Sequence, residues 1–170
     1  RVESLIFSSS YVSLSLDRSV QIVSISKNLP PSAGISLSVY KSGTKNIEGR
    51  NSINQVVEER YSTSDYYAMM SFGVSPSKNF SIGINIKAFF SSIKLYSPFN
   101  DPGSNGTFFD IGMIYNTGRW NFGAKYSNIG TGLKWKIDEG GAGQFSYTES
   151  IPNKLSLGCE YSFINNFKLL

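Results

Sequence analysis

Apolar and mostly polar positions alternate between Asn79 and Ser91, with Phe89 as the exception on the polar side, and this period limits the possible folds more than any other feature. In a β-strand, successive side chains point to opposite faces, whereas an amphipathic helix needs apolar spacings of three and four. The stretch therefore predicts a strand with one apolar and one mainly polar face. It is longer than an ordinary strand of about five or six residues and closer to the roughly 9–11 residues of a strand that crosses a bilayer. The apolar positions are Phe80, Ile82, Ile84, Ile86, Ala88 and Phe90.

Similar segments recur along the 170 residues, separated by turn-forming residues. Pro30 and Pro31, for example, cannot donate hydrogen bonds to a β-ladder and mark a turn. A composition rich in Gly, Tyr and Phe also suits strands and turns. We therefore predict an all-β protein, an antiparallel meander of about eight long strands. The predicted strands are 2–13, 19–27, 33–41, 63–75, 79–91, 107–115, 120–127 and 153–163.

The predicted connections alternate in length. Short turns are expected at 28–32, 75–79, 116–119 and 164–166, and long loops at 42–62, 92–106 and 128–152. The last of these loops begins with a strand extension through Leu133, Trp135 and Ile137 and continues into the glycine-rich stretch 139–144. In an antiparallel meander, each connection lies at the opposite end of the sheet from the connection before it. Short turns at one end and long loops at the other are typical of outer-membrane barrels.

Two of the short turns predict a strand register. If the 75–79 turn pairs Val74 with Phe80, then Phe72 meets Ile82, and apolar residues face one another along this hairpin.

The 116–119 turn similarly pairs Tyr115 with Trp120. On the other face, this register places Asp110 opposite Lys125, which predicts a cross-strand ion pair.

Glycines lie on the polar face of most predicted strands, which suggests close approach or tight curvature. A membrane barrel has bulky residues outside and small ones inside, whereas a soluble barrel packs its bulky residues inward. Aromatic residues near the short turns suit a membrane interface, although a soluble core would contain them too. The strands alone therefore leave both arrangements open. The glycines are Gly34, Gly73, Gly83, Gly112, Gly123 and Gly158, and the aromatic residues are Phe80, Tyr115, Trp120 and Phe163.

Composition excludes several kinds of chemistry. The 16 Lys and Arg residues, with a net charge of +4, are spread along the chain, so we expect no nucleic-acid partner. The chain has no histidine and a single cysteine, Cys159, which excludes an intrachain disulfide and Ser-His-Asp or Cys-His catalytic sites. It has no apolar run long enough for a transmembrane helix. We expect no enzyme activity, no cofactor and no metal site.

Several short motifs, in this order and spacing, resemble the PorV/PorQ-like branch of the FadL-like outer-membrane β-barrels. The chain departs from the family at Asn51, where members often have Asp, which leaves any role of that acid open. The motifs are Leu16-Asp17-Arg18, Ile47-Glu48-Gly49-Arg50-Asn51, Ser62-Thr63-Ser64-Asp65, 81–87, Phe109-Asp110-Ile111-Gly112, 127–131 and 151–158.

The resemblance implies a barrel of about fourteen strands in the outer membrane of a Gram-negative-type bacterium. Residues 1–170 would then be one segment of the barrel domain, incomplete at both ends. The implied function is transport across the outer membrane or service as a component of a type IX-like secretion system. The implied partners are the lipid bilayer, hydrophobic small molecules or secreted protein cargo, and other secretion-system subunits.

In such a barrel, the polar face lines the lumen. The lumen-facing candidates are Asn85, Lys87, Asp110, Lys125 and Glu160. The alternative is a soluble or cell-surface β-sandwich that uses the apolar face as its core and the long loops at one end to bind a partner. Strand length and the asymmetry of the connections favour the barrel.

Overall fold

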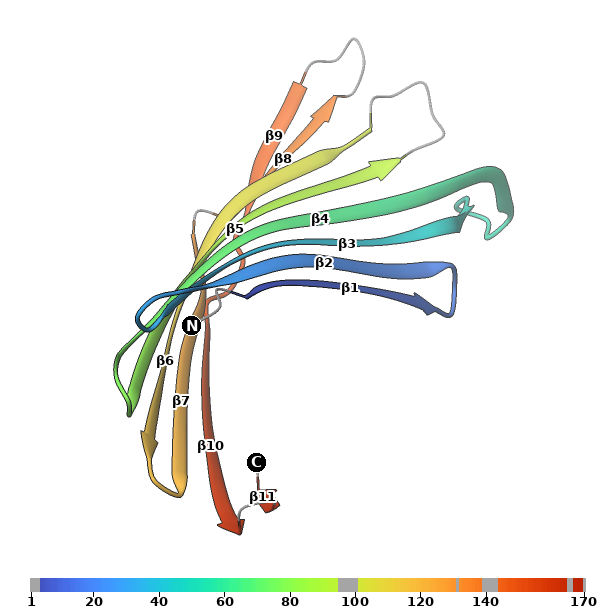
Figure 1. Ribbon diagram of the computed structural model, residues 1–170. Coiled ribbons are helices and arrows are strands. Elements are labelled where there is room, and N and C mark those ends of the chain that lie inside the picture. The colour runs from blue at the N-terminus through green and yellow to red at the C-terminus, as the bar shows by residue number, and fades with distance from the viewer. Residues whose placement is uncertain (1–3, 95–100, 131, 139–143, 165–166, 170) are drawn as a thin grey trace.

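The structure, a computed structural model, describes residues 4–94, 101–130, 132–138, 144–164 and 167–169, and is all-β (Figure 1). Its strands form one antiparallel sheet. None of the described residues belongs to a helix that could span a membrane. The strands are β1 (Leu5–Leu14), β2 (Arg18–Leu29), β3 (Ala33–Arg50), β4 (Val56–Ser77), β5 (Phe80–Lys94), β6 (Gly103–Thr117), β7 (Trp120–Gly130), β8 (Leu133–Asp138), β9 (Gln144–Glu149), β10 (Lys154–Ile164) and β11 (Phe167–Leu169).

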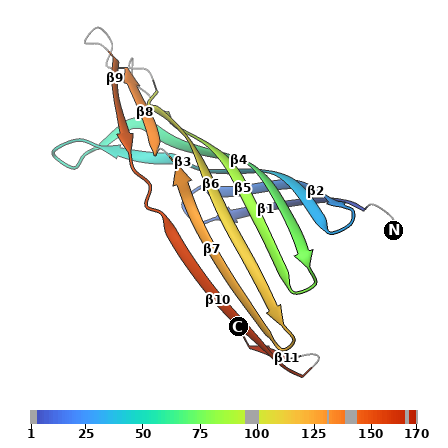
Figure 2. The same ribbon diagram turned by 90° about the vertical axis from the view of Figure 1, so that its left-hand side faces the viewer.

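The sheet is a meander in the order β1-β2-β3-β4-β5-β6-β7-β10-β11. The β8–β9 hairpin branches from it, because β8 pairs with the beginning of β6. The eight predicted strands correspond to β1–β7 and β10, so the predicted antiparallel meander is confirmed. The sheet curls into an open arc with β1 at one edge, and it does not close on itself (Figures 1 and 2).

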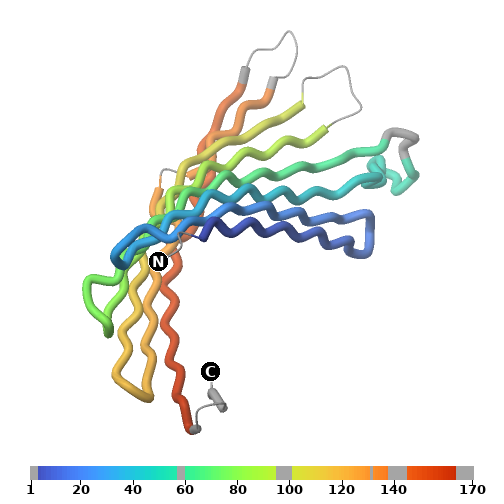
Figure 3. The backbone as a smooth tube through the Cα atoms, viewed as in Figure 1, coloured from blue at the N-terminus to red at the C-terminus, as the bar shows by residue number. Residues whose placement is uncertain are grey.

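The connections lie at the two ends of the sheet as predicted (Figure 3). At one end, β2–β3 and β4–β5 are joined by short turns at residues 30–32 and 78–79. At the opposite end, residues 51–55 join β3 to β4, β5 ends and β6 begins, and the β8–β9 hairpin lies there, together with the short β1–β2 turn at residues 15–17 (Figure 3). We call these the short-turn end and the long-connection end. Of the turn predicted at 164–166, residues 165–166 lie outside the described residues.

The prediction of a long loop over 42–62 is wrong. β3 continues to Arg50 and β4 begins at Val56, so the hairpin projects beyond β2, with Thr44 paired to Thr63. Further out, Glu48 pairs with Arg60, and their side chains form an ion pair at 3.2 Å. Polar side chains exposed on both faces hid this strand pattern. The backbone ladder does not depend on apolar alternation.

The loop predicted over 128–152 is wrong in part, because residues 128–130 belong to β7 and most of the rest forms the β8–β9 hairpin. The strand predicted through Leu133, Trp135 and Ile137 is present as β8, which pairs with β6 and β9. Leu133 at the start of β8 is buried with Phe89 and Phe108 and anchors this hairpin to the sheet. The glycine-rich stretch 139–143 lies outside the described residues. The loop predicted over 92–106 is shorter than expected, because β5 ends at Lys94 and β6 begins at Gly103; residues 95–100 lie outside the described residues.

Both predicted hairpin registers are wrong by two residues. Val74 pairs with Ile82, and Tyr115 pairs with Phe122. The strands continue further into their turns than expected. At one turn, Gly118 has a φ of +68° and donates its backbone N–H to the Asn116 side chain at 3.1 Å. Because the shift is an even number of residues, each side chain keeps its face.

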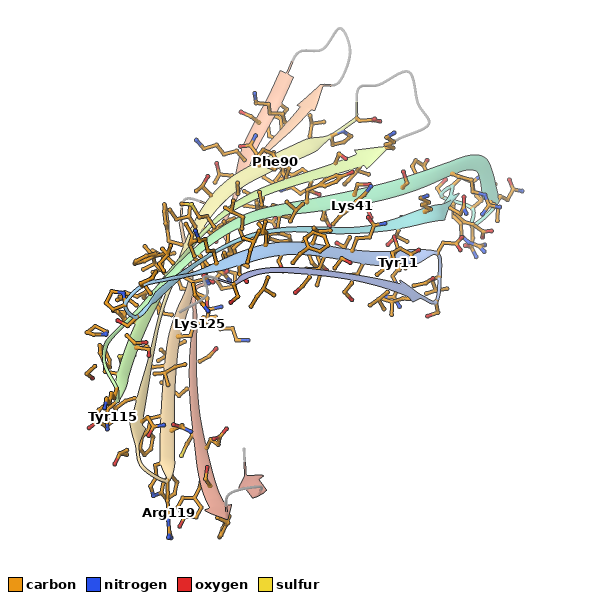
Figure 4. The ribbon with its side chains drawn as sticks, in the orientation of Figure 1. Tyr11, Lys41, Phe90, Tyr115, Arg119 and Lys125 are labelled. Atoms are coloured by element: carbon orange, nitrogen blue, oxygen red, sulfur yellow. The ribbon has the colours of Figure 1, made fainter. Side chains whose placement is uncertain are left out.

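The two faces of the sheet show opposite patterns of burial. On β6, the apolar side chains of Ile111 and Met113 are 44% and 50% exposed, whereas Phe108 and Asp110 on the other face are only 4% exposed. Tyr115 shares the face of Ile111 and Met113 and lies on the convex side of the arc (Figure 4). Curvature thus shields the polar face, which is concave, and leaves the apolar face exposed.

The polar-face glycines form a row across four strands, in which Gly34 pairs with Gly73, Gly73 with Gly83, and Gly83 with Gly112. Close approach does not explain the two further glycines on β7 and β10, because a Cβ at Gly123 or Gly158 would meet nothing within 4 Å. Of the other four, only Gly83 is in close contact, since a Cβ there would lie 3.3 Å from the backbone carbonyl oxygen of Phe72. Close approach, one of the two predicted explanations, is therefore wrong for most of these glycines.

Candidate functional site

The Asp110 carboxylate is the centre of a polar network on the concave face. Its Oδ1 atom lies 2.7 Å from Lys87 Nζ and accepts the backbone N–H of Asn128 at 3.1 Å. Its Oδ2 atom lies 3.1 Å from Lys125 Nζ and accepts the side-chain N–H of Asn85 at 3.3 Å. Strands β5 and β7 therefore both contribute donors to one carboxylate, which β6 carries between them.

The two lysines of this network differ in burial. The Lys87 side chain is only 16% exposed, while that of Lys125 is 50% exposed. Lys87 also donates to Asn128 Oδ1 at 3.0 Å, so its ammonium has two oxygen partners. A charge buried in this way depends on its partners, whereas a half-exposed ammonium keeps much of its hydration. Lys87 is thus the lysine bound most closely into the network.

The predicted ion pair of Asp110 and Lys125 is present, although the predicted register is wrong. Lys125 pairs with Gly112, and it reaches Asp110 diagonally. The residue directly opposite Asp110 on the neighbouring strand β5 is Asn85. A two-residue displacement along a strand remains within reach of a long lysine side chain. Lys125 is therefore the predicted partner of Asp110, but it contacts Asp110 diagonally and not from the directly opposite position.

Asn128 is the member of this network that the sequence prediction missed. The β6–β7 ladder is irregular between Phe109 and Ile111, and Asn128 has a φ of 63° there. This bulge turns its backbone N–H towards Asp110. Asparagine tolerates a positive φ better than most residues, and the sequence prediction read Asn128 as the first residue of a loop, whereas it is a bulge inside β7.

Glu160 lies apart from this network. It pairs with Asn121 across β7 and β10 and accepts a hydrogen bond from the Asn121 side chain at 2.9 Å. Asn85, Lys87, Asp110 and Lys125 are therefore brought together, while the fifth predicted residue belongs to a separate contact.

An aromatic row crosses the same face nearer the long-connection end. The rings of Tyr40 and Tyr67 lie 5.6 Å apart, and those of Tyr67 and Phe89 lie 4.5 Å apart. Phe89 is buried with Phe108 and Leu133. The concave face therefore has a polar part around Asp110 and an apolar part next to it.

The polar part borders a concavity of about 600 Å³. The glycines Gly83 and Gly112 line it, together with Asn85, Asp110 and Lys125. The Asp110 carboxylate is occupied by its four donors, and the described residues contain no group of three or more potential metal-ligating side chains. The arrangement is that of a hydrogen-bonded wall.

Comparison with known proteins identifies no relative of this chain: no family model, no curated protein and no solved structure matches it.

Proposed function

We propose that this chain forms part of the wall of a transmembrane β-barrel in a bacterial outer membrane. The observation that carries the proposal is the exposed apolar band on the convex face, bounded by aromatic side chains towards both ends of the strands. In water, an apolar surface of this extent would favour association. In a bilayer, it would contact lipid.

The boundary towards the long-connection end is a row of side chains in register. Tyr11 pairs with Gln21, Gln21 with Lys41, Lys41 with Tyr66, and Tyr66 with Phe90. Figure 4 shows Tyr11, Lys41 and Phe90 in this half of the sheet. Aromatic and basic side chains of this kind favour the interface between hydrocarbon and water.

The boundary towards the short-turn end is also aromatic. Phe80 pairs with Tyr115, which pairs with Phe122. Nearby, the rings of Trp120 and Tyr161 lie 4.5 Å apart. This group forms the second aromatic boundary.

The spacing of the two boundaries matches a bilayer. From Phe80 to Phe90, β5 rises about 33 Å. With the usual strand tilt of roughly 40°, this corresponds to a height of about 25 Å, which is the height of the apolar band of outer-membrane barrels. Between these two residues, the convex face of β5 carries Ile82, Ile84, Ile86 and Ala88.

The concave face suits the inside of the same barrel. Its buried charges satisfy one another around Asp110, as expected for a polar barrel interior. A soluble β-sandwich would instead cover the apolar face with a second sheet. The exposed side chains of Ile111 and Met113 support the barrel over that alternative.

The family resemblance suggests what such a barrel does. We propose transport across the outer membrane or service in a type IX-like secretion system, with hydrophobic compounds or secreted proteins as cargo. Neither activity requires a catalytic group in this wall. Further strands would complete the barrel between the open edges, β1 and β11.

Tryptophan fluorescence tests the lipid-facing assignment. The full-length protein from native outer membranes is reconstituted in vesicles of ordinary or brominated lipid, since bromine quenches indoles that contact acyl chains. Trp120 lies in the aromatic boundary, and Trp135 donates to Glu149 on the β8–β9 hairpin at 2.9 Å. We expect Trp120→Phe to remove most of the quenchable emission and the matched variant Trp135→Phe to leave it.

A gel mobility shift provides the second readout. A closed membrane barrel migrates differently in detergent before and after heating, and the protein should co-fractionate with outer-membrane vesicles. Recovery in the soluble fraction, with equal emission in ordinary and brominated vesicles, would overturn the proposal. The apolar face would then be the surface of a protein interface.

A further inference from the structure

The convex face has a depression where two small residues meet. Ala68 and Ala88 are cross-strand partners, and Val39 pairs with Ala68 from the other side. Larger side chains occupy the rows on both sides, Tyr66 with Phe90 and Met70 with Ile86. The result is an apolar groove of about 550 Å³, lined by residues that include Val23, Leu37, Val39, Ala68, Met70 and Ala88.

Lys41 lies one row beyond the lining of this groove. Lys41 follows Val39 by two residues on β3, so it lies on the same face and one row nearer the long-connection end. Its Nζ atom lies 5.2 Å from the centre of the Tyr66 ring. Tyr66 and Gln21 flank Lys41 on the neighbouring strands, and all three belong to the same row.

Within the described part of the chain, Lys41 forms no ion pair, and the ring of Tyr66 is its charge-stabilising contact. The neighbouring carboxylate of Asp65 lies on the opposite face, where it accepts a hydrogen bond from Ser91 at 2.6 Å. A second cation, Lys94, lies further along the convex face of β5. This rim is therefore positively charged above an apolar groove.

We propose that the groove binds a phosphorylated lipid of the outer leaflet of the lipid A type. One acyl chain lies along Ala68 and Ala88, and the phosphate accepts hydrogen bonds from Lys41 Nζ and the Gln21 amide. This inference rests on the proposed function, in which the long-connection end faces outward. Basic side chains at the edge of an apolar surface attract anionic lipid headgroups.

Lipid retention in the full-length protein tests this site. The protein is extracted from native outer membranes in mild detergent, and bound lipid A is quantified by mass spectrometry. We expect wild type to retain it, Ala88→Phe to lose it because the ring fills the groove, and Lys41→Gln to lower retention by about fivefold. Lys41→Arg should restore retention, since it keeps the charge.

A second groove on the convex face provides the matched control. It measures about 450 Å³ and is lined by Met113, Tyr115, Phe122 and Ala124, with no basic residue among its described lining side chains. Ala124→Phe should therefore leave lipid A retention unchanged. The heat-dependent gel shift establishes that every variant has folded, and Lys41→Gln tests the site even if Ala88→Phe does not fold.

Each remaining outcome is decisive. Equal retention in wild type, Lys41→Gln and Ala88→Phe overturns the site, as does retention of a glycerophospholipid or an uncharged amphiphile in place of lipid A. If the emission of Trp120 is still quenched by brominated lipid, only this inference fails. If the quenching and the gel shift are also lost, the proposed barrel fails with it.

Discussion

Lys87 and Asp110 lie two residues out of register on neighbouring strands, and their charged atoms are 2.7 Å apart. This diagonal contact joins the middle of β5 to β6, and Lys125 extends the network from β7. The network holds three strands of a strongly curved sheet in a fixed register.

Removing the Asp110 charge should destabilise the protein strongly. Asp110→Leu leaves the largely buried Lys87 ammonium without its carboxylate, and we expect a loss of about 3–5 kcal/mol in the free energy of unfolding. The matched variant Lys125→Met removes a half-exposed ammonium and should cost no more than about 1 kcal/mol. Unfolding by urea in lipid vesicles measures both. Equal stability of Asp110→Leu and wild type would contradict the assigned role of Asp110.

Two substitutions at Asn128 distinguish the conformational strain of a positive φ from the loss of the side-chain amide. Asn128→Ala loses the amide that binds Lys87 and places an alanine at positive φ, which should cost roughly 2–3 kcal/mol. Asn128→Gly loses the same amide without the conformational strain and should be more stable than the alanine variant by about 1 kcal/mol. The same urea measurements compare them. An alanine variant as stable as the glycine variant would argue against the positive φ.

Substitution by alanine should have different effects on stability at two glycines of β7. At Gly130, a Cβ would collide with the backbone carbonyl oxygen of Thr107 and the ring of Phe108, so Gly130→Ala should cost about 1–3 kcal/mol. At Gly123, a Cβ meets nothing within 4 Å, so Gly123→Ala should be neutral or stabilising by up to about 1 kcal/mol. Thermal unfolding of the two variants checks the difference. A reversed order of stability would contradict the close packing of the end of β7 against Thr107 and Phe108 of β6.

The loss of stability caused by a charge on the convex face should depend on the depth of that position in a bilayer. Ile84 lies midway between the aromatic boundaries and is 47% exposed. In lipid, Ile84→Arg should cost about 2–4 kcal/mol, while Phe90→Arg at the boundary should cost about 0–1 kcal/mol from the charge. On a water-exposed surface, Ile84→Arg would change stability by only about 0.5 kcal/mol. Folding into vesicles measures both, and a small effect at Ile84 would count against contact with lipid.

The sequence alone predicted the properties that depend on neighbouring residues. Alternation such as that from Phe80 to Phe90 identified the eight long strands and the apolar face of each, because the strand period is a local property of the backbone. Turn residues such as Pro30 and Pro31 located one end of the sheet. These signals also brought Asp110 and Lys125 together as partners. They failed at the outer half of the β3–β4 hairpin, where mostly polar residues form the strands, and at β9, which was predicted as part of a loop.

Tertiary structure decided the register, the bulge and the burial of each face. The hairpins are shifted by two residues because their strands continue into the turns, a choice that the alternating pattern does not distinguish. Lys87 and Asn128 become partners of Asp110 only when three strands meet around an irregularity. The concave face is buried because the sheet curves, and curvature arises from the twist of many strands together. Alternation thus determined which side chains share a face, and the curved sheet decided which face would be shielded.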